Sequence, residues 1–227
     1  MKSELSNGTH QKLIRRMLQQ SGGAKRNVPI GTALFLEGDP LNQFSYLRSG
    51  SVKIERAHGA WNVLLSVVQA PAVLCDCAAY GERTHSFTAV ALENCVVVEI
   101  PVREFLFALS ADAVLWRSLA HVALQRQRAA ERAVALLKTS DIEERLALTL
   151  CDLCEDVSGE PGAGWNLKIS QGELANLIGA VRETTSTALN RLARRGFVKL
   201  GRRSIRVVNP VSLRESLQSH QAMAAQP

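Results

Sequence analysis

The first hundred residues alternate between short apolar runs and turn-forming residues. Between about Pro29 and Ile100 the apolar runs are "ALFLEG", "FSYLRSGSVKIER", "WNVLLSVV" and "ENCVVVEI", and Gly, Pro, Asn and Asp separate them. Short β-like segments with regular turn residues are typical of an antiparallel roll or barrel. We therefore predict an antiparallel, jelly-roll-like β-roll over residues 29–109, preceded by an N-terminal extension with a short helix over residues 1–28.

The pattern becomes helical after Pro101. No glycine or proline occurs from Val102 to Leu137, and apolar residues recur there at alternating spacings of four and three. This heptad spacing predicts a long helix that packs along a second helix. We expect a dimerisation helix and hinge over residues 110–140. The predicted dimer interface consists of Leu115, Leu119, Val122, Arg126, Ala129, Ala133 and Leu136.

A second apolar track runs beside this seam on the same predicted helix. It consists of Trp116, Ala120, Ala123, Gln127, Ala130, Val134 and Leu137. Two adjacent tracks allow the helix to pack on its own domain and on a second copy of the chain. The alternative is an ordinary amphipathic core helix.

A second domain is expected after a hinge at residues 138–141. The stretch "TSDIEERLALTLCDLCEDV" predicts a helix that begins at Ser140 or Asp141, and "SGEPGAGW" predicts a turn-rich linker. In "SQGELANLIG", Ser170 and Glu173 have the spacing of a capping box, and Gly179 suits the left-handed position that ends a helix.

The rest of this domain completes a winged helix. A helix is expected from Arg182 to Arg195, and two helices joined by a short turn with glycine form a helix-turn-helix. The following "FVKLGRRSIRVVN" alternates around a Gly-Arg-Arg turn, which predicts a two-stranded wing. We predict a winged helix-turn-helix over residues 141–218 and a C-terminal tail over residues 219–227, which makes the fold class α+β.

Charge concentrates in the same segment. The chain has a formal net charge of +6, and residues 166–206 alone hold nine Lys or Arg against two Glu, a local net charge of +7. Clustered cations favour binding to double-stranded DNA, because each neutralised phosphate releases counterions. A solvated basic face without a ligand is the alternative.

The second helix offers residues that can read bases. In helix-turn-helix docking the N-terminal residues of that helix meet base edges in the major groove. Arg182 can donate to guanine and Glu183 can accept from cytosine, so G and C pairs are expected in each half-site. The remaining predicted DNA-binding residues are Ser170, Thr185 and Ser186, together with the phosphate-binding arginines Arg191, Arg194, Arg195, Arg202 and Arg203.

These motifs resemble the CRP/FNR superfamily of bacterial transcription regulators over nearly the whole chain. The resemblance rests on "ELANLIGAVRETTSTALNRLARRGFVKLGRRSIRV", on "GTALFLEGDPLNQFSYLRSGSVKI" and on the long helix. It implies a sensor β-roll and a homodimer on a palindromic promoter site, with RNA polymerase as a further partner if the protein is an activator. The family's recognition pair matches Arg182 and Glu183, its next serine matches Ser186, and Thr187 stands where some members carry an arginine.

The resemblance also bears on the effector. Where cyclic-nucleotide-binding members carry Gly-Glu and Arg-Ser-Ala, this chain has Cys75, Asp76, His85, Ser86 and Phe87. Their adenine-contacting positions become Ala130 and Glu131. Loss of the phosphate-binding arginine and gain of an acid argue against cAMP.

The segment "LCDCAAY" keeps three hypotheses open. Cys75, Asp76 and Cys77 lie where CO-sensing haem regulators of the superfamily carry Cys-x-His, so a thiolate of Cys75 or Cys77 could bind haem with His85 as a substitute ligand. A thiol redox switch and buried structural cysteines are the alternatives. An FNR-type iron–sulfur cluster is not expected, because no cysteine precedes Cys75.

Other functional classes have weaker signals. Cys151 and Cys154 have the Cys-x-x-Cys spacing of a thiol oxidoreductase, but they lie well inside a predicted helix, where packing thiols are the simpler interpretation. We expect no enzyme; a dimeric protein-binding module remains an alternative. No apolar run approaches the ~20 residues of a membrane helix, and the N-terminus lacks a secretory pattern, so we expect a cytoplasmic protein that binds no membrane.

Overall fold

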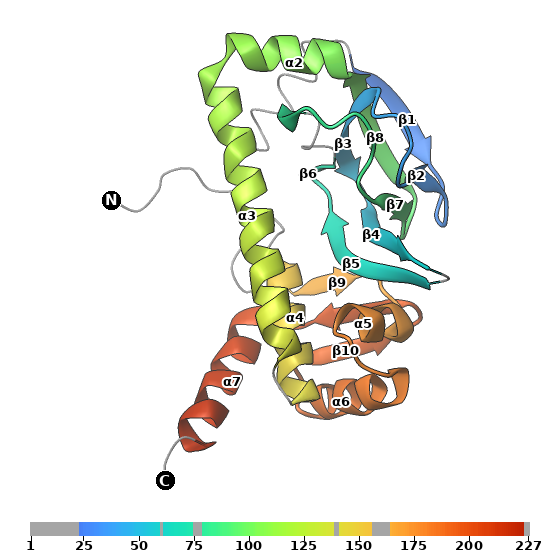
Figure 1. The fold of residues 1–227 in the computed structure, drawn as a ribbon. Coiled ribbons are helices and arrows are strands. Elements are labelled where there is room, and N and C mark those ends of the chain that lie inside the picture. The colour runs from blue at the N-terminus through green and yellow to red at the C-terminus, as the bar shows by residue number, and fades with distance from the viewer. Residues whose placement is uncertain (1–22, 60, 75–78, 139–140, 156–163, 225–227) are drawn as a thin grey trace. The chain divides into compact units, whose positions relative to one another are not determined.

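The computed structural model describes residues 23–59, 61–74, 79–138, 141–155 and 164–224 (Figure 1). The predicted short N-terminal helix, Cys75, Asp76, Cys77, Ser140 and most of the "SGEPGAGW" linker lie outside these residues. The chain divides into two compact units, Met1–Arg128 and Ala129–Pro227, which are described separately.

The first unit contains the predicted antiparallel β-roll, which is confirmed. Its strands are β1 (Ala24–Val28), β2 (Ala33–Phe35), β3 (Gln43–Ser49), β4 (Ser51–His58), β5 (Trp61–Gln69), β6 (Ala72–Val73), β7 (Thr88–Ala91) and β8 (Cys95–Pro101). They form two four-stranded sheets with strand orders β1-β8-β3-β6 and β2-β7-β4-β5. Buried residues of β3 and β8, among them Phe44, Leu47, Val97 and Ile100, form the centre of the core.

The turn between β3 and β4 requires glycine. Gly50 has a φ of 92°, and a Cβ at this position would lie 2.6 Å from Cys95 Sγ. The Cys95 thiol is buried and donates to the carbonyls of Ser51 and Glu93, and burial raises its pKa. Cys95 therefore has a packing role at this turn.

The structure places the start of the roll earlier than the predicted boundary at residue 29. Ala24–Val28 pairs with β8, and Arg26 donates to both carboxylate oxygens of Glu99 at 3.0 and 2.7 Å. The hydrogen bond to Glu99 raises the pKa of Arg26. The polar sequence "AKRNV" conceals this strand, because its stability depends on pairing and on one ion pair rather than on apolar alternation.

The predicted continuous helical stretch is two helices, α2 (Val102–Ala111) and α3 (Ala113–Leu137). Asp112 adopts extended backbone angles between them, and its Oδ1 accepts from the backbone N–H groups of Val114 and Leu115. The aspartate thus ends one helix and caps the next, with a bend of 115° between them. α2 packs on β3 and β8 at one end of the roll, where Phe105 stacks on Phe44 (Figure 1).

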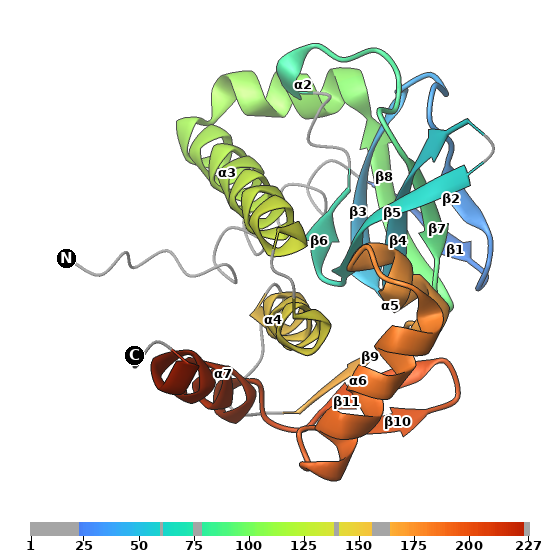
Figure 2. The same cartoon turned by 60° about the horizontal axis from the view of Figure 1, so that its bottom comes forward.

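The second unit contains the end of α3 and the predicted winged helix-turn-helix. Its further elements are α4 (Ile142–Glu155), β9 (Trp165–Leu167), α5 (Gln171–Leu177), α6 (Arg182–Arg194), β10 (Val198–Gly201), β11 (Ser204–Val207) and α7 (Pro210–Ala224). The wing has three strands in the order β10-β11-β9, one more than predicted, and Figure 2 shows them beside α6. α4 packs against α6 and α7 around a core that includes Leu146, Leu150, Leu189 and Leu192.

No single helix among the described residues has both the length and the apolar composition to cross a membrane.

Candidate DNA-binding surface

The predicted capping box fixes the first helix of the helix-turn-helix. Ser170 Oγ accepts from the backbone N–H of Glu173 at 3.2 Å, and Glu173 Oε2 accepts from the backbone N–H of Ser170 at 2.9 Å. The Ser170 hydroxyl also donates to Glu173 Oε2 at 2.7 Å. Both groups of Ser170 are thus used to start α5, while its contact with DNA stays a prediction.

The turn between α5 and α6 depends on Gly179. Its φ is 63°, in the left-handed region that the sequence predicts. A Cβ on this residue would lie 2.9 Å from Leu137 Cδ2, at the end of α3. Arg145 Nη1 from α4 lies 4.0 Å from the same position and donates to the Ile178 carbonyl at 2.9 Å. The turn that leads into α6 is therefore in contact with the end of α3 and with α4.

One face of α6 is buried, and it includes Thr185, one of the predicted DNA-binding residues. Thr185, Ala188, Leu189 and Leu192 point into the core at the spacing of a helical stripe. Thr185 has no exposed surface, and its hydroxyl donates to the Val181 carbonyl at 3.0 Å. The prediction that Thr185 binds DNA is wrong, because its position in the helical repeat places it on the packing face.

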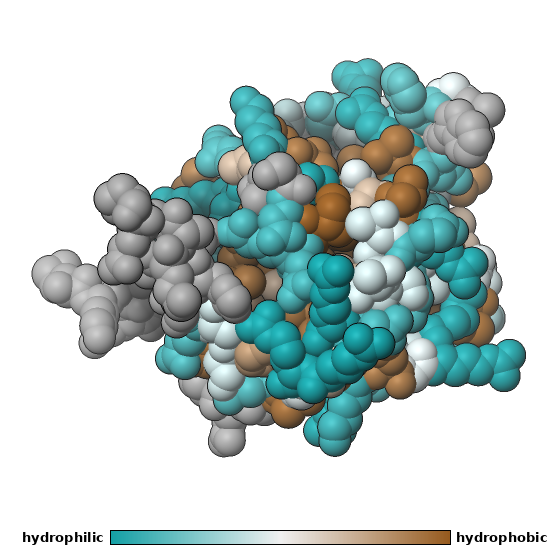
Figure 3. Space-filling view, turned by 90° about the horizontal axis from the view of Figure 1, so that it is seen from below, coloured by the Kyte–Doolittle hydropathy of each residue, from teal (hydrophilic) through white to brown (hydrophobic). Residues whose placement is uncertain are grey.

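The opposite face of α6 is exposed and polar. Arg182 and Glu183 are exposed at its N-terminal end, and Ser186 is half-buried one turn later. Thr187 and Asn190 are exposed further along, and Asn190 is not among the predicted DNA-binding residues. The helical period would have found it, because Asn190 lies seven residues after Glu183 on the same face. α6 lies at the bottom of Figure 1. Figure 3 shows the molecule from that side, and hydrophilic side chains cover much of it.

The predicted phosphate-binding arginines differ in their partners. Glu143 of α4 lies 3.1 Å from Arg195 Nη1 and 3.6 Å from Arg191 Nη1. Arg203 of the wing turn lies 3.6 Å from Glu173. In the sequence, Glu143 is recognisable only as an acidic residue in the first turn of a helix. That pattern does not predict its ion pairs with arginines of α6 and its C-cap. Arg194 and Arg202 are exposed.

A hollow of about 420 Å³ lies between the wing and the start of α5. Its lining includes Arg182 from α6, Arg203 from the wing and Gly172 from α5. The Arg203 guanidinium beside a hollow open to solvent suits a phosphate of a bound strand, next to the base-reading position of Arg182.

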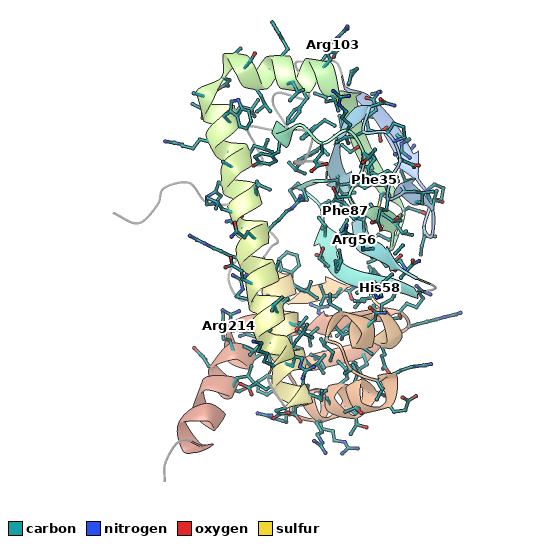
Figure 4. All side chains as sticks on the ribbon, in the orientation of Figure 1. Phe35, Arg56, His58, Phe87, Arg103 and Arg214 are labelled. Carbon is teal, nitrogen blue, oxygen red and sulfur yellow. The ribbon has the colours of Figure 1, made fainter. Side chains whose placement is uncertain are left out.

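The sensor positions are described in part. His85 is 7% exposed, and its ring stacks on Phe35 with centroids 3.8 Å apart, while Phe87 lies 5.7 Å from Phe35. Figure 4 shows Phe35 and Phe87 within the roll. Burial lowers the pKa of His85 against the opposing fields of Asp39 and Glu99. The residue at the family's arginine position is thus a buried imidazole that favours its neutral form.

The other predicted effector positions that the structure describes are exposed at the surface. Ser86 is exposed on its loop, and Ala130 and Glu131 are exposed on α3. Among the described residues no three His, Cys, Asp or Glu side chains are grouped as metal ligands. Cys75, Asp76 and Cys77 lie outside the described residues, so their role stays a prediction.

The structure corrects the predicted dimer seam. Leu115 is 4% and Leu119 0% exposed, and both belong to the core of the first unit. Arg126 donates to the Val73 carbonyl of β6, so it also faces its own roll. Of the other predicted positions, Val122, Ala129 and Leu136 are half-buried and Ala133 is exposed.

The neighbouring track is the exposed one. Trp116 is 37%, Val134 59% and Leu137 51% exposed. The heptad pattern contained both tracks, but periodicity alone does not reveal which track its own domain covers.

Together these features define a two-unit DNA-binding regulator, in which a β-roll precedes a winged helix-turn-helix with a basic outer face. Residues 25–112 match the family model of the cyclic nucleotide-binding domain, and residues 144–216 match that of the Crp-like helix-turn-helix domain. The chain belongs to the CRP/FNR family of transcription regulators.

Curated relatives and solved structures agree with this assignment. The chain is 30% identical over 193 residues to the Cyclic AMP receptor protein of Thermus thermophilus, with 84% of this chain and 87% of that protein covered. It is 28% identical over 194 residues to the Anaerobic regulatory protein of Pasteurella multocida, with coverage of 84% and 71%. The structure of FixK2 from Bradyrhizobium japonicum has the same fold, with a TM-score of 0.72 at 19% identity over 85% of this chain and 96% of that one.

Proposed function

We propose that the protein binds a palindromic promoter site as a homodimer and regulates transcription in response to a signal other than cAMP. The observation that carries the proposal is the two-sided character of α6. A buried stripe holds this helix in the domain, while Arg182 and Glu183 remain exposed at its N-terminal end. The first turn of a helix-turn-helix recognition helix is the part that meets base edges. Arg182 is assigned to guanine and Glu183 to cytosine.

Backbone contacts supply most of the affinity in this proposal. Arg194 and Arg202 are exposed, and Arg203 lines the hollow beside α5. Arginine contacts to phosphate fix the register on the duplex and carry no base preference. These side chains are therefore assigned to affinity and salt dependence.

Selection of bound duplexes from a random pool tests the DNA-binding proposal. The expected product is an inverted repeat with G and C pairs in each arm and half-sites about 34 Å apart. Arg182→Ala should lose the preference at the guanine position, whereas Arg194→Ala should weaken all duplexes equally. A selected site without twofold symmetry would contradict the homodimer, and no enrichment would contradict sequence-specific binding.

The second copy is assigned to the exposed track of α3. Trp116, Val134 and Leu137 are large apolar residues that are partly exposed, and exposed apolar side chains can mark a protein–protein interface. Val134→Glu should shift the protein toward monomer in sedimentation velocity. Val211→Glu is the matched control, because Val211 is a similarly exposed valine, 50% against 59%, on α7. An equal effect of the two substitutions would argue against this interface.

The effector proposal rests on His85. A neutral ring stacked on Phe35 supplies no cation for a cyclic phosphate. Addition of cAMP should leave the affinity for the selected DNA unchanged, and calorimetry should show no saturable heat. An absorption spectrum with and without added haem tests the thiolate hypothesis for Cys75 or Cys77, with a Soret band as the supporting result.

A further inference from the structure

The middle of α6 carries two exposed residues that the Arg182 and Glu183 pair does not explain. Thr187 and Asn190 lie four and seven residues after Glu183, on the side opposite the buried stripe of Ala188, Leu189 and Leu192. The helical rise places Asn190 about 10 Å from Glu183 along the axis, roughly three base-pair steps of B-DNA. A helix that docks through Glu183 and lies along the major groove would bring both residues over the next base pairs.

Thr187 presents its methyl group. Its hydroxyl donates to the backbone carbonyl of Glu183 at 3.0 Å, within the helix. The donor of the hydroxyl is thus used within the helix, while the methyl group remains for an apolar contact. A threonine methyl packs against the C5 methyl of thymine in the major groove.

Asn190 presents a carboxamide that the rest of the domain does not use. The residue is exposed, and among the described residues its side chain makes no hydrogen bond. A carboxamide can donate to N7 and accept from N6 of the same adenine, the paired contact by which asparagine recognises that base. Arg191, the next residue, instead has Glu143 as its neighbour at 3.6 Å.

We propose that Thr187 and Asn190 read A·T pairs that follow the G and C pairs of each half-site, with Thr187 on a thymine methyl and Asn190 on an adenine. The inference rests on the proposed DNA-binding function and extends it to the base pairs beyond Arg182 and Glu183. The rival is a contact of the Asn190 amide with phosphate, which would carry no sequence preference.

Modified bases separate the two readings. The full-length protein is titrated by fluorescence anisotropy against the selected duplex, against the same duplex with deoxyuridine for the thymine, and against one with 7-deazaadenine for the adenine. Deoxyuridine lacks only the methyl group, and 7-deazaadenine lacks only N7, so base pairing is retained. Each modification should weaken binding of the unmodified protein, by roughly tenfold for the lost N7 contact.

Protein variants assign each effect to a residue. Asn190→Ala should abolish the penalty of 7-deazaadenine and leave that of deoxyuridine. Thr187→Ser, which keeps the hydroxyl, should abolish the deoxyuridine penalty, whereas Thr187→Val, which keeps a methyl, should retain it. Both positions are exposed, and circular dichroism melting verifies that each variant is folded.

The outcomes distinguish this inference from the proposed function. If the protein selects an inverted repeat but Asn190→Ala weakens all duplexes equally, the base-reading role is overturned and the regulator assignment stands. Retention of both penalties in the variants overturns it as well. Failure to select any DNA sequence overturns the proposed function and this inference together.

Discussion

Glu143 on α4 accepts a hydrogen bond from Arg195 Nη1 at the end of the recognition helix, at 3.1 Å. The same carboxylate lies 3.6 Å from Arg191 Nη1. Two arginines assigned to phosphate are therefore already paired within their own domain. Any phosphate that binds them would have to compete with this carboxylate, so we expect Glu143 to limit the affinity for DNA.

Glu143→Gln is expected to tighten DNA binding and to steepen its salt dependence. Removal of the carboxylate frees one or two arginines to neutralise phosphates, so the slope of log K against log salt should become more negative by about 1–2. Anisotropy titrations at four salt concentrations measure this slope. Glu144→Gln removes the same charge from the next position of α4 and serves as the control. Equal slopes for the two variants would show that only net charge matters.

Gly179→Ala is expected to destabilise the winged helix by about 1–3 kcal/mol. The residue has a φ of 63°, and the new Cβ would lie 2.9 Å from Leu137 Cδ2. Part of the cost is backbone strain and part is the clash. Leu137→Ala removes the clash but not the strain, so the double variant should recover part of the loss, as measured by denaturant unfolding. Strict additivity of the two substitutions would contradict the Leu137 contact.

His85 should make the first unit less stable in acid. Its pKa is lowered in the folded protein by burial, so the unfolded chain binds the proton more readily. The neutral form contributes its full stability above the unfolded pKa, which is about 6.5, and this contribution is lost as pH falls from there toward the folded pKa. Asp39 and Glu99 oppose the shift, but desolvation outweighs them.

Thermal melting from pH 8 to pH 5 measures this effect. The melting temperature of the unmodified protein should fall more steeply below about pH 6.5 than that of His85→Phe, which keeps an aromatic ring beside Phe35 and does not titrate. His58→Gln, at an exposed position of β4, controls for loss of a histidine elsewhere. Parallel curves for the unmodified protein and His85→Phe would refute the prediction.

Local signals in the sequence predicted most of the second unit. The capping box at Ser170, the left-handed Gly179 and the alternation of the wing are short-range patterns, and each has its expected geometry. Two predictions failed, one against a local helical repeat and one because a strand pairs with a distant one. Thr185 has a polar side chain but is buried, and β1 is polar in sequence but pairs with β8.

The break at Asp112 shows the same limit inside one helical pattern. Apolar spacing continues across this residue, whereas its side chain caps α3 and redirects the chain. Packing on the roll then decides that Leu115 and Leu119 are core residues and that Trp116 is exposed. Sequence periodicity supplied both tracks of α3, and only tertiary packing could assign them.

Cys151 and Cys154 should affect stability rather than chemistry. They are 1% and 3% exposed on α4, and Cys151 Sγ lies 3.5 Å from the Pro210 carbonyl at the start of α7. Serine at either position buries a hydroxyl in a largely apolar site, which should cost about 1–3 kcal/mol. Alanine should cost less, because it adds no polar group to the interior.

Thiol labelling separates packing from catalysis at this pair. In the Cys75→Ala/Cys77→Ala background, DTNB should modify the remaining thiols slowly in the native protein and rapidly after unfolding, because burial excludes the reagent. The folded Cys151→Ser/Cys154→Ser variant should bind the selected DNA with unchanged affinity. Rapid labelling of the native protein, or a DNA affinity that changes when these two thiols are oxidised, would instead favour a redox role. We expect neither rapid labelling nor a change in DNA affinity, since the pair lies inside a helix that packs between α6 and α7.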